Sequence, residues 1–162
     1  MNTRQRKMVG HGSLIMLFGL LAGIALVMKL IGGFEVLPSM IVEFELPATE
    51  RAWARTHAGG LMNGLMVLLV AVVIWALNVP EVLERKLFWM IVGAGYANTI
   101  FYWAGMFAPN RALSIGSNRL GEANIWGVIG VVPALIFTFV SIYAFFLLMR
   151  FAFASAAQKN QE

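Results

Sequence analysis

The sequence predicts an all-α integral membrane protein, a bundle of four antiparallel helices that forms a single domain over residues 1–162. Three observations lead to this fold class. Hydrophobic residues make up 60% of the chain and charged residues only 12%, against roughly 25% charged residues in an ordinary soluble domain. The mean hydropathy is +0.78. The apolar residues also fall into four blocks, each about as long as the ~20 residues that cross a bilayer as a helix.

The four predicted spans cover residues 10–31, 58–79, 87–108 and 124–149. None carries an ionic residue at its centre, and each must be helical because backbone groups that face lipid find no other hydrogen-bond partners. The first block follows a basic start, as the core of a signal peptide does. However, it is longer than such a core and ends in Lys29-Leu30-Ile31 rather than in small residues. We therefore interpret it as a span.

The connections between the spans predict the topology. Residues 32–56 are expected to form a long loop, residues 80–86 a tight basic turn, and residues 109–123 a loop rich in Gly and Asn. An even number of spans places both termini on one side, where seven Lys and Arg residues lie (4, 6, 7, 85, 86, 150 and 159), against five on the other (29, 51, 55, 111 and 119). The positive-inside rule then favours cytoplasmic termini, in an inner membrane of bacterial type.

Composition excludes several kinds of site and partner. The chain has no Cys, which excludes disulfides, iron–sulfur clusters, Cys-rich zinc sites and covalent haem attachment through C-x-x-C-H. The net charge of +4 is spread between the apolar blocks rather than clustered. Nucleic acid is therefore not an expected partner, whereas the lipid bilayer is.

Glycines recur at the spacing that lets membrane helices approach closely. Gly19 and Gly23 form one such pair, and Gly60 and Gly64 form another. The spacing fits contacts within one bundle as well as contacts between protomers, and it does not decide between them.

His57 is the first candidate for chemistry, because a polar side chain inside a span costs free energy unless it has a partner. At 100° per residue, it shares one helical face with Gly60 and Gly64. An imidazole above two turns that lack side chains could hold a flat ligand such as haem. The alternative is an interfacial histidine that is hydrogen-bonded to water or to a loop glutamate.

The small number of histidines limits how a haem could bind. The chain has only two His, and His11 and His57 open consecutive spans. They are expected at opposite membrane faces, ~30 Å apart, so that any haem would have one His ligand and an open position. On the third predicted span, Asn98 and Tyr102 lie one turn apart on one face, and Asn63 could flank a ligand at His57.

Several motifs together resemble the styrene oxide isomerase family. They are Arg6-Lys7-Met8-Val9-Gly10-His11-Gly12, then Gly32-Gly33-Phe34-Glu35, then Trp53-Ala-Arg-Thr-His57 followed by Asn63-Gly64, and finally Asn98, Phe101-Tyr102 and Pro109-Asn110-Arg111. The resemblance covers roughly residues 4–125 and weakens in the last span.

The resemblance implies a function and a set of site residues. Members of the family are four-span membrane enzymes that form trimers and bind haem b near the subunit interfaces. They convert aryl epoxides to aldehydes by a redox-neutral Meinwald rearrangement, as in styrene oxide to phenylacetaldehyde. His57 matches the axial ligand of the ferric haem, and Asn63 and Tyr102 match the polar residues beside the substrate. We further expect Gly60 and Gly64 to bind the cofactor.

Arg111 lies in the matched loop, where it could pair with a haem propionate. This pairing is our own inference and is not carried over from the family.

Two other functions stay open on the sequence. One is a b-haem electron-transfer or quinone-linked membrane subunit. The other is a membrane scaffold without enzymatic activity, in which the glycine pairs serve only association.

Overall fold

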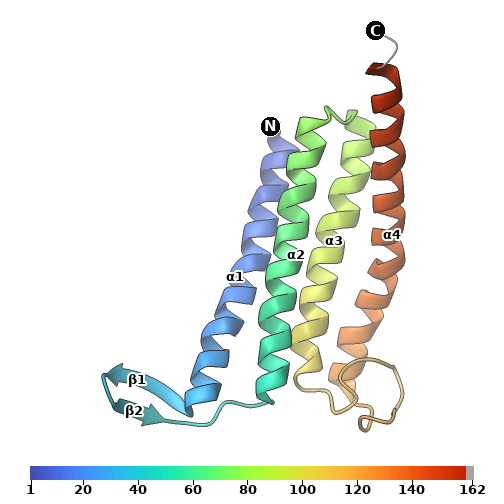
Figure 1. Cartoon of the computed structure of the whole chain (residues 1–162). Helices are drawn as coiled ribbons and strands as arrows, with labels where there is room; N and C mark the ends of the chain where they lie inside the picture. The colour runs from blue at the N-terminus through green and yellow to red at the C-terminus, as the bar shows by residue number, and fades with distance from the viewer. Residues whose placement is uncertain (160–162) are drawn as a thin grey trace.

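A computed structural model describes residues 1–159, so the last three residues of the predicted 1–162 domain lie outside the described residues. The side chain of Lys159, which the charge count above includes, also lies outside the description. The elements are α1 (Thr3–Ile31), β1 (Gly33–Leu37), β2 (Met40–Glu43), α2 (Glu50–Ala76), α3 (Glu81–Gly105) and α4 (Ile125–Lys159). The start of α1 and the end of α4 lie at one end of the helices, and the β-strands and the loop between α3 and α4 lie at the other (Figure 1).

Each predicted span is covered by a helix, and local capping explains why two helices begin earlier than the apolar blocks. Asn2 caps α1 in a capping box with Gln5, and the helix ends at Gly32, which has a left-handed backbone with φ of 73°. Thr49 caps α2 by accepting a hydrogen bond from the amide of Ala52. Capping side chains satisfy the free amides of the first turn, so both helices extend beyond the apolar residues.

The segment 32–56, which we predicted as a loop, contains two strands and the first turns of α2. β1 and β2 pair antiparallel, with Gly33 opposite Glu43 and Glu35 opposite Ile41. Ser39 turns the chain between them with φ of 67°. Gly33 is required at the paired edge, because a Cβ there would collide with the backbone of Val42. The all-α prediction is therefore correct for the helices but missed this hairpin.

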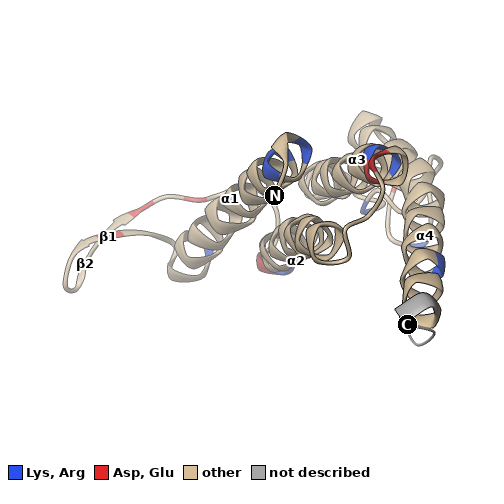
Figure 2. Ribbon diagram, turned by 90° about the horizontal axis from the view of Figure 1, so that it is seen from above, with Lys and Arg blue, Asp and Glu red and all other residues tan. Residues whose placement is uncertain are grey.

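The four helices of the predicted bundle pack in an open arrangement. α1 packs mainly on α2 and also contacts α3, α2 contacts α3, and within the described chain α4 packs on α3 alone among the helices. Seen from above, the helices form an open row with α1 and α4 at its two ends (Figure 2). α4 exposes large apolar side chains such as Leu135, Phe139 and Ile142. An apolar helix in lipid does not need protein on every side, so the row does not have to close.

Three helices are long and apolar enough to cross a membrane, namely α1, α2 and α4. α3 is not among them. It carries Tyr96, Asn98, Thr99 and Tyr102 within its second half, and these polar groups lower its hydropathy.

The α1–α2 interface depends on the two glycine pairs. A Cβ on Gly19 would lie 2.8 Å from the backbone nitrogen of Leu61, and one on Gly64 would lie 2.8 Å from the carbonyl oxygen of Gly12. The two backbones approach closely because these positions carry no side chain. The pairs therefore serve packing within one copy of the chain, one of the two possibilities that the spacing left open.

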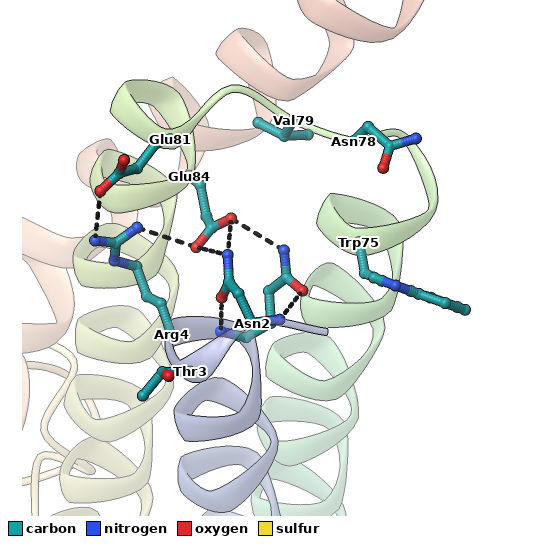
Figure 3. A pocket seen from close by; sticks show the side chains of 9 residues that line it. Asn2, Thr3, Arg4, Trp75, Asn78, Val79, Glu81 and Glu84 are labelled. Carbon is teal, nitrogen blue, oxygen red and sulfur yellow. Dashed lines mark hydrogen bonds and ion pairs between the residues drawn. The ribbon is translucent and has the colours of Figure 1, made fainter.

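A buried carboxylate fastens the start of α1 to the start of α3. Glu84 is only 2% exposed, and its oxygens accept hydrogen bonds from Asn2 at 2.9 and 3.0 Å, from Gln5 at 3.0 Å and from Arg4 at 3.1 Å (Figure 3). A charge buried this deeply requires such partners. The cluster fixes how α1 enters the row of helices.

Candidate functional site

His57 lies in the α1–α2 interface, where its imidazole ring packs on Gly23. A Cβ added to Gly23 would lie 2.5 Å from the Nδ1 atom of this ring. Nδ1 is also 2.9 Å from the carbonyl oxygen of Gly19. The Gly19–Gly23 pair of α1 thus forms the bed on which the histidine of α2 lies.

This contact determines which ring nitrogen of His57 is available to a ligand. A backbone carbonyl only accepts hydrogen bonds, so Nδ1 must carry the proton and donate it to Gly19. In the neutral ring Nε2 then has the free lone pair, and it makes no hydrogen bond to any described residue. A histidine that ligates a metal is commonly held this way, with the second nitrogen donating to a carbonyl.

Gly60 and Gly64 do not line a space beside His57. Gly60 packs against the Cα of Gly19, and Gly64 packs against Met16 and the carbonyl of Gly12. We predicted that these two glycines would face a cofactor, and this expectation needs correction. The three residues share a face as expected, but α1 covers that face.

Asn63 lies on another side of α2, against α3. Its side chain is 9% exposed, and its Oδ1 accepts a long hydrogen bond of 3.5 Å from Nδ2 of Asn98. Its own Nδ2 is buried without a partner in the described chain. An unpaired buried donor costs about 1–3 kcal/mol, and such exceptions in native structures call for an explanation.

Tyr102 lies on the same side of α2 as Asn63. Its ring packs directly on Gly59, where a Cβ would collide with it. Thr56 fastens the two helices here, because its hydroxyl donates to the carbonyl of Ala52 at 2.9 Å and lies 3.3 Å from that of Tyr102. The phenolic oxygen of Tyr102 has no hydrogen-bond partner among residues 1–157. The α2–α3 seam therefore presents a buried amide donor without a protein partner and a half-buried phenol.

The structure brings some of the predicted site residues together and keeps others apart. Asn63 of α2 contacts Asn98 of α3, and Tyr102 of α3 packs on Gly59 of α2, whereas His57 of α2 contacts α1. α2 stands between the two groups. Sequence reasoning singled out Asn98 as a neighbour of Tyr102 but missed Gly59, whose signal was only the Gly59-Gly60 doublet.

His11 takes part in a separate contact. Its Nδ1 is 2.9 Å from the hydroxyl of Tyr96, and its ring packs edge-on against Phe88 and Tyr96. His11 lies 8–12 residues before the Gly19–Gly23 bed, which is about 12–18 Å along the helix at 1.5 Å per residue. The expected ~30 Å between the histidines was therefore too large, although they still lie too far apart to share one metal.

Arg111 lies in the loop after α3 with a left-handed backbone, φ 58°. The preceding Asn110 is fully buried and shapes this loop, since its amide donates to the carbonyls of Ser114 and Gly116 at 2.9 and 3.0 Å. The side chain of Arg111 is exposed and lines a cavity with Arg51 and Arg55. This cavity lies between α2 and α3, away from the side of α2 that carries His57.

Comparison with known proteins identifies the family. The family model described as styrene oxide isomerase matches residues 4–153 of the chain. A styrene-oxide isomerase from Pseudomonas fluorescens is 41% identical over 133 residues, which cover 82% of this chain and 79% of that protein. The match extends into α4, to residue 153, beyond the motifs that carried the resemblance. The chain belongs to the styrene oxide isomerase family.

Proposed function

We propose that this protein is an isomerase that converts aryl epoxides such as styrene oxide to aldehydes such as phenylacetaldehyde, by a redox-neutral Meinwald rearrangement. Family membership supports the epoxide as substrate. The observation that carries the rest is the 2.9 Å contact between Nδ1 of His57 and the carbonyl of Gly19, because it leaves Nε2 available as a donor to a metal.

The residues of the chain fit a haem b group with one protein ligand. Nε2 of His57 is the donor atom, and the carbonyl of Gly19 fixes the ring and raises its basicity as a ligand. When bound, ferric haem supplies a Lewis acid for the epoxide oxygen. Gly60 and Gly64 do not take part in holding it, since α1 covers them.

Asn63 and Tyr102 act on the oxygen of the epoxide. As the C–O bond at the aryl-bearing carbon breaks, negative charge grows on this oxygen, and the Nδ2 of Asn63 and the hydroxyl of Tyr102 donate hydrogen bonds to it. The unpaired Nδ2 supports this role because it is a donor already free of protein partners. Asn98 contacts the other end of the Asn63 amide, which orients Nδ2 toward the substrate.

The rearrangement itself requires no electron donor. The aryl ring stabilises the positive charge on the carbon that has lost the oxygen, and a hydride moves to it from the neighbouring carbon as the carbonyl forms. Electrons and atoms balance within the one molecule, so no nicotinamide or oxygen is consumed. The apolar surroundings of α2 and α3 exclude water, which would otherwise convert the cation to a diol.

The functional unit is a trimer. Within one copy, α2 separates His57 from Asn63 and Tyr102. A site completed between copies brings the ligand histidine of one protomer to the amide and phenol of another. The open row of helices supports this assembly, because it leaves apolar faces of α1 and α4 uncovered.

All four helices cross the bilayer as antiparallel spans, with the termini on the cytoplasmic side of an inner membrane. α3 has 25 residues, about 37 Å at 1.5 Å per residue, and thus matches a ~30 Å hydrocarbon core. Its polar side chains have partners inside the protein, which supports this placement: Asn98 contacts Asn63 of α2, Tyr96 contacts His11 of α1, and the buried Thr99 donates to the carbonyl of Gly95.

The test is to incubate the purified protein with styrene oxide in the absence of nicotinamide cofactors and oxygen. Phenylacetaldehyde should accumulate in proportion to enzyme. No aldehyde, or a diol as the main product, contradicts the proposed function.

A further inference from the structure

Three arginines converge on one cavity at the end of the helices that carries the hairpin. The cavity has a volume of about 370 Å³ and is lined by Arg51 and Arg55 of α2 and by Arg111 of the α3–α4 loop, together with Thr49, Gly105 and Pro109. Arg55 is the most enclosed of the three, because its guanidinium lies against α3, 3.4 Å from where a Cβ of Gly105 would be. Sequence reasoning drew attention only to Arg111.

The charge in this cavity is not neutralised by the protein. None of the lining residues is acidic, and within the described chain the three guanidinium groups form no ion pair; the ion pairs involve Arg4 and Lys29 only. Of the glutamates at this end, Glu43, Glu45 and Glu50 line a different cavity with Lys29. Glu35 and Glu122 line neither cavity and form no ion pair in the described chain. Three like charges repel one another unless an anion lies between them.

The backbone adds to the positive potential. α2 begins at Glu50, next to the cavity, and its N-cap Thr49 and first-turn residue Ala52 line the wall. The N-terminus of a helix carries partial positive charge and favours anions, although here Thr49 already accepts from the amide of Ala52 and Glu50 lies in the same turn. Arg111 is held in the left-handed region, φ 58°, beside the fully buried Asn110. Such a conformation costs free energy and persists only where the surroundings enforce it.

The place of the cluster in the membrane also needs an explanation. Positive side chains near the ends of spans are favoured on the cytoplasmic side. In the proposed orientation, this cavity lies on the opposite side and holds three of the five basic residues there. Charges kept at the disfavoured face point to a ligand rather than to topology.

We propose that Arg51, Arg55 and Arg111 form a binding site for an oxyanion, a phosphate or a carboxylate held by guanidinium groups. Arginine favours both groups because its planar fork donates two parallel hydrogen bonds to either. At a membrane surface, the phosphate of a phospholipid headgroup is one source. The propionate carboxylates of a haem held by His57 of a neighbouring copy in the proposed trimer are the other, because within one copy the cavity lies away from the side of α2 that carries His57. Only this second source rests on the proposed function.

The test compares the triple variant Arg51→Gln/Arg55→Gln/Arg111→Gln with the control Arg119→Gln. Arg119 is exposed in the same loop but does not line the cavity. Two probes are used. Haem-depleted protein is titrated with haemin and with haemin dimethyl ester, which lacks the carboxylates, and binding is followed by absorbance. Thermal unfolding is measured in nanodiscs of dioleoylphosphatidylglycerol and of dioleoylphosphatidylcholine.

If the site binds a haem carboxylate, we expect at least tenfold weaker binding of haemin in the triple variant and unchanged binding of the dimethyl ester. If the site binds a lipid phosphate, we expect the variant to lose the additional thermal stability that phosphatidylglycerol gives the wild type, with haemin binding unchanged. Wild-type behaviour with both probes, or an equal loss in Arg119→Gln, overturns the site. If the triple variant does not fold, Arg111→Gln alone, at an exposed side chain, carries the same comparison.

Aldehyde formation is measured on the same samples. Wild-type protein that forms aldehyde while the arginine variants bind both probes normally would remove the anion site and leave the proposed function intact. Wild-type protein without isomerase activity, but with an arginine-dependent response to phosphatidylglycerol, would remove the proposed function and leave the anion site intact.

Discussion

The imidazole of His57 donates a hydrogen bond from Nδ1 to the carbonyl oxygen of Gly19, at 2.9 Å. One helix therefore fixes both the orientation and the proton of a histidine that belongs to the next helix. This arrangement requires the absence of side chains at Gly19 and Gly23. It makes α1 part of the proposed haem site, although α1 contributes no ligand.

Gly23→Ala tests this bed directly. The added Cβ would lie 2.5 Å from Nδ1 of His57 and displace the ring. Loss of an orienting partner around a metal ligand typically lowers affinity 10–100-fold, so we expect haem affinity to fall by about that factor in an absorbance titration. Gly10→Ala on the same helix is the matched control, because a Cβ there meets nothing within 4 Å. Equal haem affinity in the two variants would contradict the role of Gly19 and Gly23 in orienting His57.

Asn63→Leu should separate stability from activity. The substitution removes a buried donor that lacks a partner, so we expect the variant to be more stable by about 1 kcal/mol, within the 1–3 kcal/mol that an unsatisfied group costs. Isomerase activity should fall, because the donor to the epoxide oxygen is gone. Thermal unfolding and aldehyde formation measure the two effects. A variant that loses stability and keeps full activity would show that the amide is structural.

Tyr102→Phe should lower turnover without loss of haem. The ring still packs on Gly59, and only the hydroxyl is removed. Deletion of one donor to a developing oxyanion commonly costs about 10²–10³-fold in kcat, and we expect a decrease of that order. Tyr143→Phe is the control, since Tyr143 is an exposed side chain of α4. An unchanged kcat in Tyr102→Phe would remove the hydroxyl from the mechanism.

Glu84→Ala should destabilise the protein by several kcal/mol. The substitution leaves Asn2, Arg4 and Gln5 without their shared acceptor at a buried position, and breaking a buried ion pair typically costs about 3–5 kcal/mol. Glu81→Ala removes the exposed neighbour, whose side chain is 81% accessible, and such pairs contribute about 0–1 kcal/mol. Denaturant titration of the two variants in detergent gives the comparison. Similar midpoints would show that Glu84 does not anchor α1.

The helices could be predicted from the sequence because hydropathy alone sets where a chain can cross a bilayer. Their arrangement could not. α4 is apolar on all sides and exposes Leu135, Phe139 and Ile142, so no hydrophobic stripe indicates which face meets protein. The hairpin was missed for a related reason, since every residue of β2 is exposed and the alternation that marks a half-buried strand is absent.

For the candidate site too, the residues could be predicted from the sequence, but their arrangement could not. His57, Asn63 and Tyr102 were identified as polar groups in apolar spans, and their chemistry follows from residue type. The relation between them depends on which face of α2 each neighbour covers. A helical wheel of α2 shows His57, Gly60 and Gly64 on one face, but it does not show that α1 occupies that face through Gly19 and Gly23.

The proposed role of His57 as the haem ligand is tested by comparing His57→Ala with the wild type, with and without added imidazole. Each protein is purified in detergent, its Soret absorption is recorded, and phenylacetaldehyde is measured after anaerobic incubation with styrene oxide. We predict that the variant loses both haem and aldehyde formation, and that imidazole restores both in part. A His57→Ala protein that retains its Soret band and its activity would contradict the account.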